Sequence, residues 1–319
     1  MKYKDPNCSV GERVEDLLAR MTLEEKVAQC VQIYIPPEGR EEILARIRKT
    51  GLGSRILSAV PLGGSVTQRT AGIADLNEVQ RIAVEESRLG IPILSGMDVI
   101  HGQHTVFPIP LAMAAAFDPA ALEQASAIAA AETASMGIHW TFAPMMDIAR
   151  DPRWGRIIEG YGEDPYLGAQ MAAAAVRGFQ GELDEKGYAR PGRVLACAKH
   201  YVGYGAAEGG RDYNTGEITD HTLRNIYLPP FKAAVQAGVG TVMSAFHDLN
   251  GEPASGSRYL LTDILKDEFG FEGFIVSDWA SVGELVNHRV VAGERDAAAL
   301  AFDAGLDMEM ISECYTHHL

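Results

Sequence analysis

Polar residues that could do chemistry follow several short apolar runs of the sequence. They are Asp98 after IPILSGM, Asp147 and Arg150 after TFAPMM, Lys199-His200 after VLACA, His247-Asp248 after TVMSAF, and Asp278-Trp279 after GFIVS. If these runs are parallel strands of one barrel, their carboxyl ends meet at a single face, where barrel enzymes place their active sites. We therefore expect these side chains to surround one mouth.

The residue types in this set suit a sugar. The hydroxyl groups of a neutral polyhydroxylated ligand need paired donors and acceptors, which cations and carboxylates supply, and the faces of a sugar ring stack on tryptophan. The corresponding reaction is glycosyl transfer. A carboxylate such as Asp278 attacks the anomeric carbon, a second carboxyl group protonates the departing oxygen, and water then releases the sugar.

Other interpretations of the carboxylates stay open. A carboxylate at the end of a strand is often a helix cap or a salt-bridge partner, and this alternative applies to Asp98 and more strongly to Asp147. It suits Asp278 less well, because that residue follows a wholly apolar run and is followed at once by Trp279. A simple cap does not require that arrangement.

Further alternatives concern the lysine and the tryptophans. Lys199-His200 is compatible with a structural pair, or with a lysine that forms an imine as in an aldolase. Trp140 and Trp154 are compatible with positions in the core or in a wall, and we assign neither a role. Three functions follow from the residues: a retaining glycosidase, a lysine-dependent aldolase, and a barrel that binds sugar without turning it over.

The elements that position these residues follow from the alternation of apolar runs with Ala-rich or amphipathic stretches of helical length, which predicts βα units. Helix starts are predicted at a capping box from Thr22 to Glu25, at Asp118-Pro119 and at Asp164-Pro165. Without a glycine-rich dinucleotide fingerprint, eight such units favour a single-domain (β/α)8 TIM-type barrel of the α/β class. The predicted strands are Cys30–Tyr34, Arg55–Ala59, Ile91–Met97, Trp140–Met146, Val194–Ala198, Gly240–Ala245, Gly273–Ser277 and Leu306–Met310.

The composition argues against several kinds of partner. The 319 residues include 43 acidic and 28 basic side chains, a formal charge of -15, so nucleic acid and an anionic membrane surface would be repelled. The 4 cysteines show no metal-ligand spacing, and we expect reduced thiols, no metal and no cofactor. The charged N-terminal stretch lacks a secretory signal, which predicts a cytoplasmic location for the chain as it stands. A chain whose signal had been removed would look the same, so a periplasmic or secreted location stays open.

Five longer segments together resemble the signatures of glycoside hydrolase family three. They are SGMDVIHGQHTVFP, APMMDIARDPRWGRIIEGYGEDP, AKHYVGYGAAEGGRDYN, MSAFHDLNGEPASGS and GFEGFIVSDW. They occur in the family's order, each at the end of a predicted strand, and the resemblance runs from about residue 10 to the end of the chain. It implies a retaining, exo-acting β-glycosidase that hydrolyses terminal non-reducing β-D-glucosyl residues of a small β-glucoside or oligosaccharide. A β-glucosidase is favoured, with β-xylosidase specificity as the alternative.

The resemblance also implies roles for individual residues. The aspartate of the SDW motif is the family's nucleophile, which places a covalent glycosyl-enzyme intermediate on Asp278, and Trp279 would form a wall of the sugar site. The implied substrate-binding residues are Asp98, Arg156, Lys199, His200 and Met243.

Two positions depart from the family's pattern. His104 stands where similar proteins often carry arginine, which would weaken a charged donor to the sugar or make it pH-dependent. Tyr204, in KHYVGYG, stands where the hexosaminidase members carry a catalytic histidine. That histidine-based acid is therefore missing.

The β-glucosidases and β-xylosidases of the family take their acid/base glutamate from a second domain after the barrel. The resemblance therefore implies that residues 1–310 form the barrel, that residues 311–319 begin a linker, and that the second domain is absent from this chain. General acid catalysis contributes roughly 100- to 10,000-fold, so a chain without its acid/base would lose most activity on natural disaccharides. Glu208 and Asp212 are the first candidates for an acid within the chain.

Overall fold

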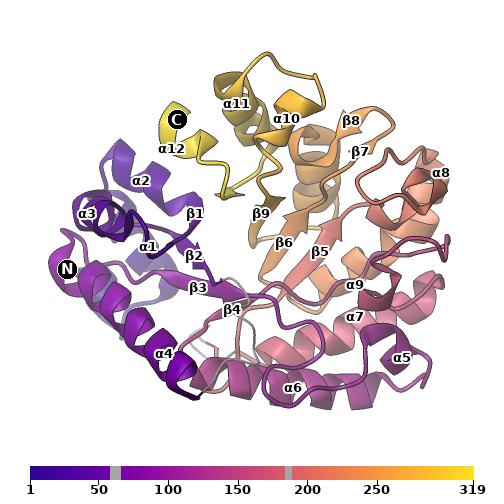
Figure 1. Cartoon of the computed structure of the whole chain (residues 1–319), viewed down its shortest axis with the longest axis horizontal. Helices are drawn as coiled ribbons and strands as arrows, with labels where there is room; N and C mark the ends of the chain where they lie inside the picture. The colour runs from indigo at the N-terminus through magenta and orange to yellow at the C-terminus, as the bar shows by residue number, and fades with distance from the viewer. Residues whose placement is uncertain (58–65, 184–188) are drawn as a thin grey trace.

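Eight parallel strands form the centre of the molecule, and helices surround them (Figure 1). The computed structural model describes residues 1–57, 66–183 and 189–319. The colours of Figure 1 run once around the barrel from indigo to yellow, and the strand order is β4-β3-β2-β1-β10-β9-β6-β5. The strands are β1 (Val31–Tyr34), β2 (Ser54–Ile56), β3 (Leu94–Met97), β4 (Trp140–Thr141), β5 (Cys197–Tyr201), β6 (Thr241–Ser244), β9 (Phe274–Trp279) and β10 (Met308–Met310).

Backbone hydrogen bonds between the segments of β4 and β5 close the barrel. The Thr141 amide donates to the Leu195 carbonyl oxygen at 2.8 Å, and the Cys197 amide donates to the Ala143 carbonyl oxygen at 2.8 Å. These bonds join the two ends of the eight-stranded order, so each strand has a neighbour on both sides. The predicted (β/α)8 TIM-type barrel is confirmed.

Two strands extend further at their carboxyl ends than the sequence predicts. The predictions stop at Ala198 and Ser277, whereas β5 continues to Tyr201 and β9 to Trp279. The backbone of each extension still pairs with its neighbour, because a polar side chain at a barrel mouth does not interrupt the ladder. The polar residues of these two segments therefore lie on the strands themselves and not on the loops that follow.

The other predicted strands either agree with the structure or differ from it in length. β4 is shorter than the predicted segment Trp140–Met146, and Pro144 has no amide hydrogen to give to a sheet. The predicted segment Arg55–Ala59 overlaps β2, but its last two residues lie outside the described part of the chain. The remaining strand predictions are confirmed by β1, β3, β6 and β10.

Helices cover the outside of the barrel, and their predicted start signals are confirmed. Thr22 and Glu25 form a capping box, and the side chains of Asp118 and Asp164 each accept the amide hydrogen three residues further on. No helix in the described ranges is both long and apolar enough to cross a membrane. The α-helices are α1 (Val10–Leu18), α2 (Leu23–Gln29), α3 (Arg40–Thr50), α4 (Val66–Arg81), α5 (Pro110–Ala114), α6 (Pro119–Ser135), α7 (Pro165–Gln180), α8 (Asp220–Thr222), α9 (Pro229–Gln236), α10 (Glu284–Asn287), α11 (Glu294–Ala304) and α12 (Cys314–His318).

Short irregular elements complete the chain. A small antiparallel hairpin follows β6 and consists of β7 (Asp248–Leu249) and β8 (Glu252–Pro253). The 3-10 and π segments are η1 (Lys2–Lys4), η2 (Ile82–Glu86), η3 (Ile157–Glu159), η4 (Tyr204–Ala206), η5 (Glu208–Gly210), η6 (Leu223–Tyr227), η7 (Ala254–Gly256) and η8 (Tyr259–Glu268).

A cluster of buried apolar side chains, from β2, β4, β5, β6, β9, β10 and the residue Phe142 after β4, fills the interior of the barrel. Its members are Ile56, Trp140, Phe142, Cys197, Met243, Val276, Met308 and Met310. The fully buried Trp140 donates from Nε1 to Thr241 Oγ1 at 2.9 Å and makes edge contacts with Phe142. Gly96 permits this packing, because a Cβ there would lie 2.6 Å from the Phe142 ring. The interior is a packed core and not a pore, and Trp140 belongs to that core.

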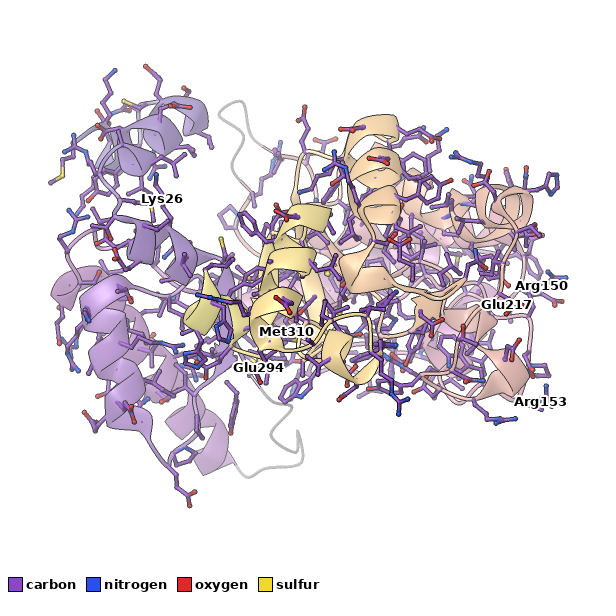
Figure 2. The ribbon with its side chains drawn as sticks, turned by 90° about the horizontal axis from the view of Figure 1, so that it is seen from above. Lys26, Arg150, Arg153, Glu217, Glu294 and Met310 are labelled. Atoms are coloured by element: carbon purple, nitrogen blue, oxygen red, sulfur yellow. The ribbon has the colours of Figure 1, made fainter. Side chains whose placement is uncertain are left out.

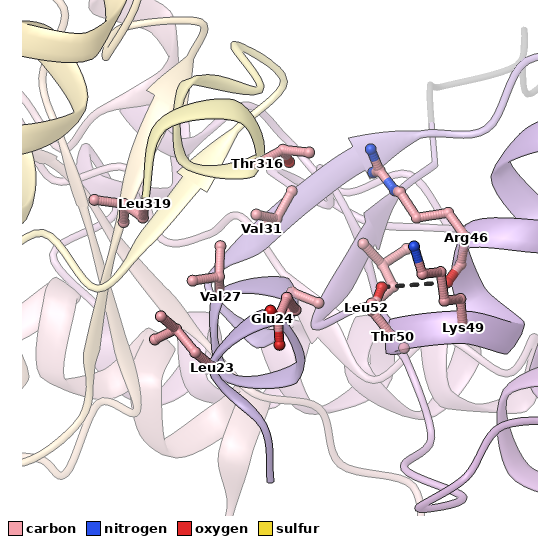
Figure 3. Close-up of a pocket in the computed structure, with 12 residues that line it drawn as sticks. Leu23, Glu24, Val27, Val31, Arg46, Lys49, Thr50, Leu52, Thr316 and Leu319 are labelled. Carbon is pink, nitrogen blue, oxygen red and sulfur yellow. Dashed lines mark hydrogen bonds between the residues drawn. The ribbon is translucent and has the colours of Figure 1, made fainter.

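The end of the chain packs on the barrel beside α2. Helix α12 lies against α11 and α2, and the buried Tyr315 donates its hydroxyl hydrogen to the Leu306 carbonyl oxygen at 2.8 Å. Figure 3 shows an apolar groove between α2, α3 and α12, whose lining includes Leu23, Val27 and Leu319. Residues 311–319 therefore include a helix that is packed against the barrel.

Replacement of Trp140 by alanine is expected to lower the free energy of unfolding by about 3–5 kcal/mol, because it empties the centre of the barrel. Urea unfolding followed by circular dichroism measures the change. The matched control is Tyr166→Ala, since Tyr166 is 74% exposed, and its effect should stay within about 0.5 kcal/mol. Equally small effects of both substitutions would contradict the supporting role of the interior cluster.

Candidate active site

The strand ends bring four of the predicted side chains together. Lys199 Nζ donates to Asp98 Oδ1 at 2.6 Å, which joins β5 to the residue that follows β3. His200 Nε2 lies 3.4 Å from Asp278 Oδ2, which joins β5 to β9. The structure thus groups these two carboxylates, the lysine and the histidine at one end of the barrel.

The carboxyl group of Asp278 is buried. The residue is 7% exposed, and Oδ1 accepts the Trp279 amide hydrogen at 2.7 Å. Oδ2 has no hydrogen-bond partner within the described ranges. Burial raises the pKa of Asp278 to about 7, although the positive charges of Lys199 and Arg156 act against the rise. One oxygen is therefore fixed in place, while the other is available to an electrophile.

Lys199 is a buried cation beside two carboxylates. Its side chain is 5% exposed, whereas that of its partner Asp98 is 51% exposed. Burial alone would lower the pKa of Lys199, but the negative charges of Asp98 and Asp278 outweigh burial and raise it. The side chain therefore stays an ammonium at neutral pH and can donate hydrogen bonds to a ligand, while the exposed Asp98 can accept them.

Asp147 lies against His200, a contact that the sequence reasoning missed. Asp147 Oδ2 accepts the backbone amide hydrogen of His200 at 2.9 Å and lies 2.8 Å from its Nδ1. Burial raises the pKa of Asp147 to about 7 and lowers that of His200 well below its ordinary value. Asp147 orients a site residue and does not cap a helix. The available signal was its place directly after the predicted strand Trp140–Met146, as Asp98 directly follows the predicted strand Ile91–Met97.

Arg156 adds a second positive charge from the loop after β4. Glu159 holds its guanidinium through hydrogen bonds of 2.7 and 3.0 Å, and the guanidinium carbon lies 5.7 Å from the centre of the Tyr204 ring. Its charge lowers the pKa of both Asp278 and Asp147, against the larger effect of burial. Binding of sugar hydroxyls by Arg156 stays a prediction.

Aromatic side chains near the carboxylate are exposed. Trp279 is 46% exposed and Tyr213 is 51% exposed. The Tyr213 ring lies 4.5 Å from that of Phe246, and burial together with the negative charge of Asp278 raises the pKa of Tyr213. Exposed rings beside polar groups suit a sugar face. The sequence reasoning singled out neither Tyr213 nor Phe246, although the aromatic residues of the glycine-rich loop were a usable signal.

Other candidate residues have their recorded partners outside this group. Met243 is 2% exposed and belongs to the barrel-interior cluster. The buried Trp154 donates from Nε1 to Asp212 Oδ1 at 2.8 Å, so this candidate acid already has a partner. His104 lies on an exposed loop, where its amide donates to Glu132 Oε2 at 2.8 Å. Their implied roles stay predictions.

Loops after the strands carry the remaining candidates. Arg150 and Glu208 line a polar depression there together with Glu217, and Figure 2 shows Arg150 and Glu217 side by side, far from Met310 on β10. His247 is buried, and burial lowers its pKa to about 4. In the part of the chain that the structure covers, no group of three or more His, Cys, Asp or Glu side chains could hold a metal ion.

Comparisons with known proteins place the chain in a family. The model described as the glycosyl hydrolase family 3 N terminal domain matches residues 22–319. A periplasmic β-glucosidase of Salmonella typhimurium is 40% identical over 96% of this chain and 38% of its own length. A putative β-xylosidase of Formosa agariphila is 34% identical over 98% of this chain and 42% of its own length.

A solved structure is similar to this chain in both sequence and fold. The crystal structure of a β-glucosidase from Listeria innocua in complex with glucose has a TM-score of 0.85 and 37% identity, and the match covers 96% of this chain and 43% of that one. The chain therefore spans about two fifths of the length of these relatives. Because the family model covers most of the residues and the fold agrees, the chain belongs to glycosyl hydrolase family 3.

Proposed function

We propose that this chain is the sugar-cleaving barrel of a retaining, exo-acting β-glucosidase. The observation that carries the proposal is the buried carboxyl group of Asp278, with one oxygen held by a hydrogen bond and the other without a hydrogen bond in the described residues, 3.4 Å from His200 Nε2. The fixed geometry suits a nucleophile. Asp278 attacks the anomeric carbon of a terminal non-reducing β-D-glucosyl residue, the departing oxygen takes a proton, and water later cleaves the covalent intermediate.

The surrounding side chains would bind the glucosyl residue. The ammonium of Lys199 and the exposed carboxylate of Asp98 supply a donor and an acceptor for ring hydroxyls. His200 and Arg156 add further polar contacts, and Trp279 offers an exposed ring for stacking. The ion pair between Lys199 and Asp98 arranges both side chains before the sugar arrives.

The names of the similar proteins support glucose as the sugar. The Salmonella relative is a β-glucosidase, and the Listeria structure is described in complex with glucose. The Formosa relative is named as a putative β-xylosidase, which keeps xylose as the second candidate. One hydroxymethyl group distinguishes the two sugars and is worth about 1–3 kcal/mol, so the relative rates on nitrophenyl β-glucoside and β-xyloside decide between them.

The proposal includes an acid/base carboxyl group that comes from outside residues 1–319, in a second domain. Three carboxylates around the site already have partners in the described residues: Asp98 pairs with Lys199, Glu159 with Arg156, and Asp212 accepts the Trp154 indole hydrogen. The solved and curated relatives are more than twice as long as this chain, which leaves room for such a domain.

The aldolase alternative conflicts with the environment of Lys199. An imine-forming lysine must lose its proton, and such lysines have a lowered pKa from burial or a neighbouring cation. Here the carboxylates of Asp98 and Asp278 raise the pKa of Lys199 despite its burial. The ammonium form is favoured, which suits hydrogen bonding to hydroxyl groups.

Incubation with a 2-fluoroglucoside that carries a dinitrophenyl leaving group is expected to attach one fluoroglucosyl group to Asp278. This leaving group hardly needs an acid, so the reaction does not depend on a second domain. Intact mass followed by peptide mapping locates the group. Asp278→Asn should give no adduct.

The matched control for this experiment is Glu309→Gln, which alters another fully buried carboxylate on the neighbouring β10. It should be labelled like the original chain. An adduct on a different residue, or none while glucose still binds, would contradict the nucleophilic role of Asp278. The second of these results favours a barrel that binds sugar without turnover.

The rate of glucosyl release is expected to depend strongly on the leaving group. The ratio of the rate on a dinitrophenyl β-glucoside to the rate on cellobiose should be larger than in relatives that contain an acid/base, by roughly 100- to 10,000-fold. The reason is that only the leaving group of cellobiose needs protonation. Steady-state rates of both substrates under one buffer condition measure this ratio. Hydrolysis of cellobiose at ordinary β-glucosidase rates would show that residues 1–319 contain an acid.

Lys199→Met is expected to move the acid limb of the labelling pH profile, where the labelling rate falls as Asp278 becomes protonated, to higher pH. The positive charge of Lys199 lowers the pKa of Asp278, so its removal raises that pKa above about 7, and only the ionised carboxylate attacks. The pH dependence of the second-order labelling rate reports this group in the free protein. Lys26→Met, at an exposed position on α2, should leave the limb in place; an unchanged limb in Lys199→Met would refute the coupling.

A further inference from the structure

Asp147, His200 and Asp278 form a continuous line of buried polar groups. Asp147 Oδ2 accepts the His200 amide hydrogen at 2.9 Å and lies 2.8 Å from ring Nδ1. On the other side of the ring, Nε2 lies 3.4 Å from Asp278 Oδ2. The three residues are 2%, 1% and 7% exposed, respectively. The positions of the protons in this line therefore depend on the three groups themselves.

The two contacts of the ring make different demands on its single proton. A neutral imidazole carries hydrogen on one nitrogen only. With hydrogen on Nδ1, the ring donates to an ionised Asp147, and Nε2 offers Asp278 only a lone pair. With hydrogen on Nε2, the ring turns an N–H group toward Asp278, and Nδ1 must accept a hydrogen bond from a protonated Asp147. Each tautomer thus matches one protonation state of Asp147.

We propose that Asp147 is a positioning residue whose protonation selects the tautomer of His200 and thereby decides whether an N–H group or a lone pair of His200 faces Asp278. The change between the two states is balanced by one proton. When Asp147 ionises, its proton crosses to Nδ1, the Nε2–H bond breaks, and the Nε2 proton leaves to water. No other bond changes, and the ring is neutral in both states.

The surroundings place this change near neutral pH. Burial raises the pKa of Asp147 to about 7 and also raises that of Asp278 to about 7, while burial lowers that of His200 so that the ring stays neutral. The two carboxyl groups and the ring therefore exchange protons as one unit. The charged or titratable groups that act on this unit are Asp98 after β3, Arg156 and Glu159 after β4, Lys199 on β5, and His247 after β6.

The consequence for catalysis rests on Asp278 as the nucleophile of the proposed function. With Asp147 protonated, the Nε2–H group stabilises the ionised carboxylate of Asp278, which keeps the nucleophile reactive to lower pH. With Asp147 ionised, Nε2 is free to accept a hydrogen bond from a sugar hydroxyl. Asp147 itself touches neither substrate nor reacting atoms and acts through His200 alone.

The substitution Asp147→Asn fixes one of the two states. The atom at the Oδ2 position must still accept the His200 amide hydrogen, so it has to be the oxygen of the asparagine. That oxygen cannot donate to Nδ1, and the ring must then carry its hydrogen there. Asp278 then faces a lone pair of His200 in this variant at every pH.

Nitrogen-15 NMR of the full chain with labelled histidine measures the tautomer directly. The original chain should carry hydrogen on Nε2 of His200 below about pH 7 and on Nδ1 above it, following the pKa of Asp147. Asp147→Asn should show Nδ1–H throughout. The signal of His200 is assigned by its loss in His200→Gln.

Labelling by the dinitrophenyl fluoroglucoside measures the effect on Asp278. Asp147→Asn should shift the acid limb to higher pH by about one to two units and so slow labelling below that limb on the order of 10- to 100-fold, because ionised Asp278 loses a stabilising N–H group nearby. The control Glu309→Gln also changes a fully buried carboxylate, which accepts hydrogen bonds from Ser312 and from the Tyr315 amide. The Glu309→Gln variant should keep the acid limb of the original chain and the same pH-dependent change of the His200 tautomer.

A His200 tautomer that stays the same across this pH range in the original chain would overturn the proposal, and apart from the assignment by His200→Gln this measurement does not depend on a variant. Slower labelling of Asp147→Asn with an unchanged acid limb would overturn the proposal as well, because that pattern indicates a purely structural role for Asp147. Failure of the original chain to form any adduct would count against the proposed function instead, and the NMR titration would still decide the tautomer question.

Discussion

The burial of the Asp278 carboxylate beside two cations is the interaction on which the rest of the site depends. A carboxylate removed from water is stable only when opposite charge and hydrogen bonds compensate for lost hydration. Lys199 and Arg156 supply that charge, and each is held in turn by its own carboxylate, Asp98 or Glu159. The result is an alternation of charges across the barrel mouth. A pKa of about 7 for Asp278 shows that compensation is incomplete, which keeps this carboxylate more basic than an exposed one.

The barrel beneath the mouth explains how such a charge arrangement is kept in place. Lys199, His200 and Asp278 lie on strands whose backbones pair with their neighbours, and side chains on strands are held more rigidly than side chains on loops. The interior cluster around Trp140 fills the space between these strands, so they cannot collapse inward. The side chains of Trp279 and Tyr213 are exposed, so a sugar could reach them.

Much of this architecture could be predicted from the sequence, because apolar periodicity and helix caps are local signals. The barrel and the gathering of Lys199 and Asp98 at one mouth follow from apolar runs that end in polar residues, and the three helix starts follow from their caps. Asp147 could not be assigned in this way, since its position after a strand is equally typical of a cap, and only the fold brings His200 onto it. The ends of β5 and β9 were also beyond prediction, because a polar residue at a barrel mouth looks like the start of a loop.

The most direct test of the account is a crystal structure of the chain after reaction with the fluoroglucoside. The account predicts continuous electron density between a carboxyl oxygen of Asp278 and the anomeric carbon, with Lys199 and Asp98 in hydrogen-bonding contact with the ring hydroxyls. A sugar bound without a covalent link, or linked to any other side chain, would contradict the assignment of Asp278 as the nucleophile.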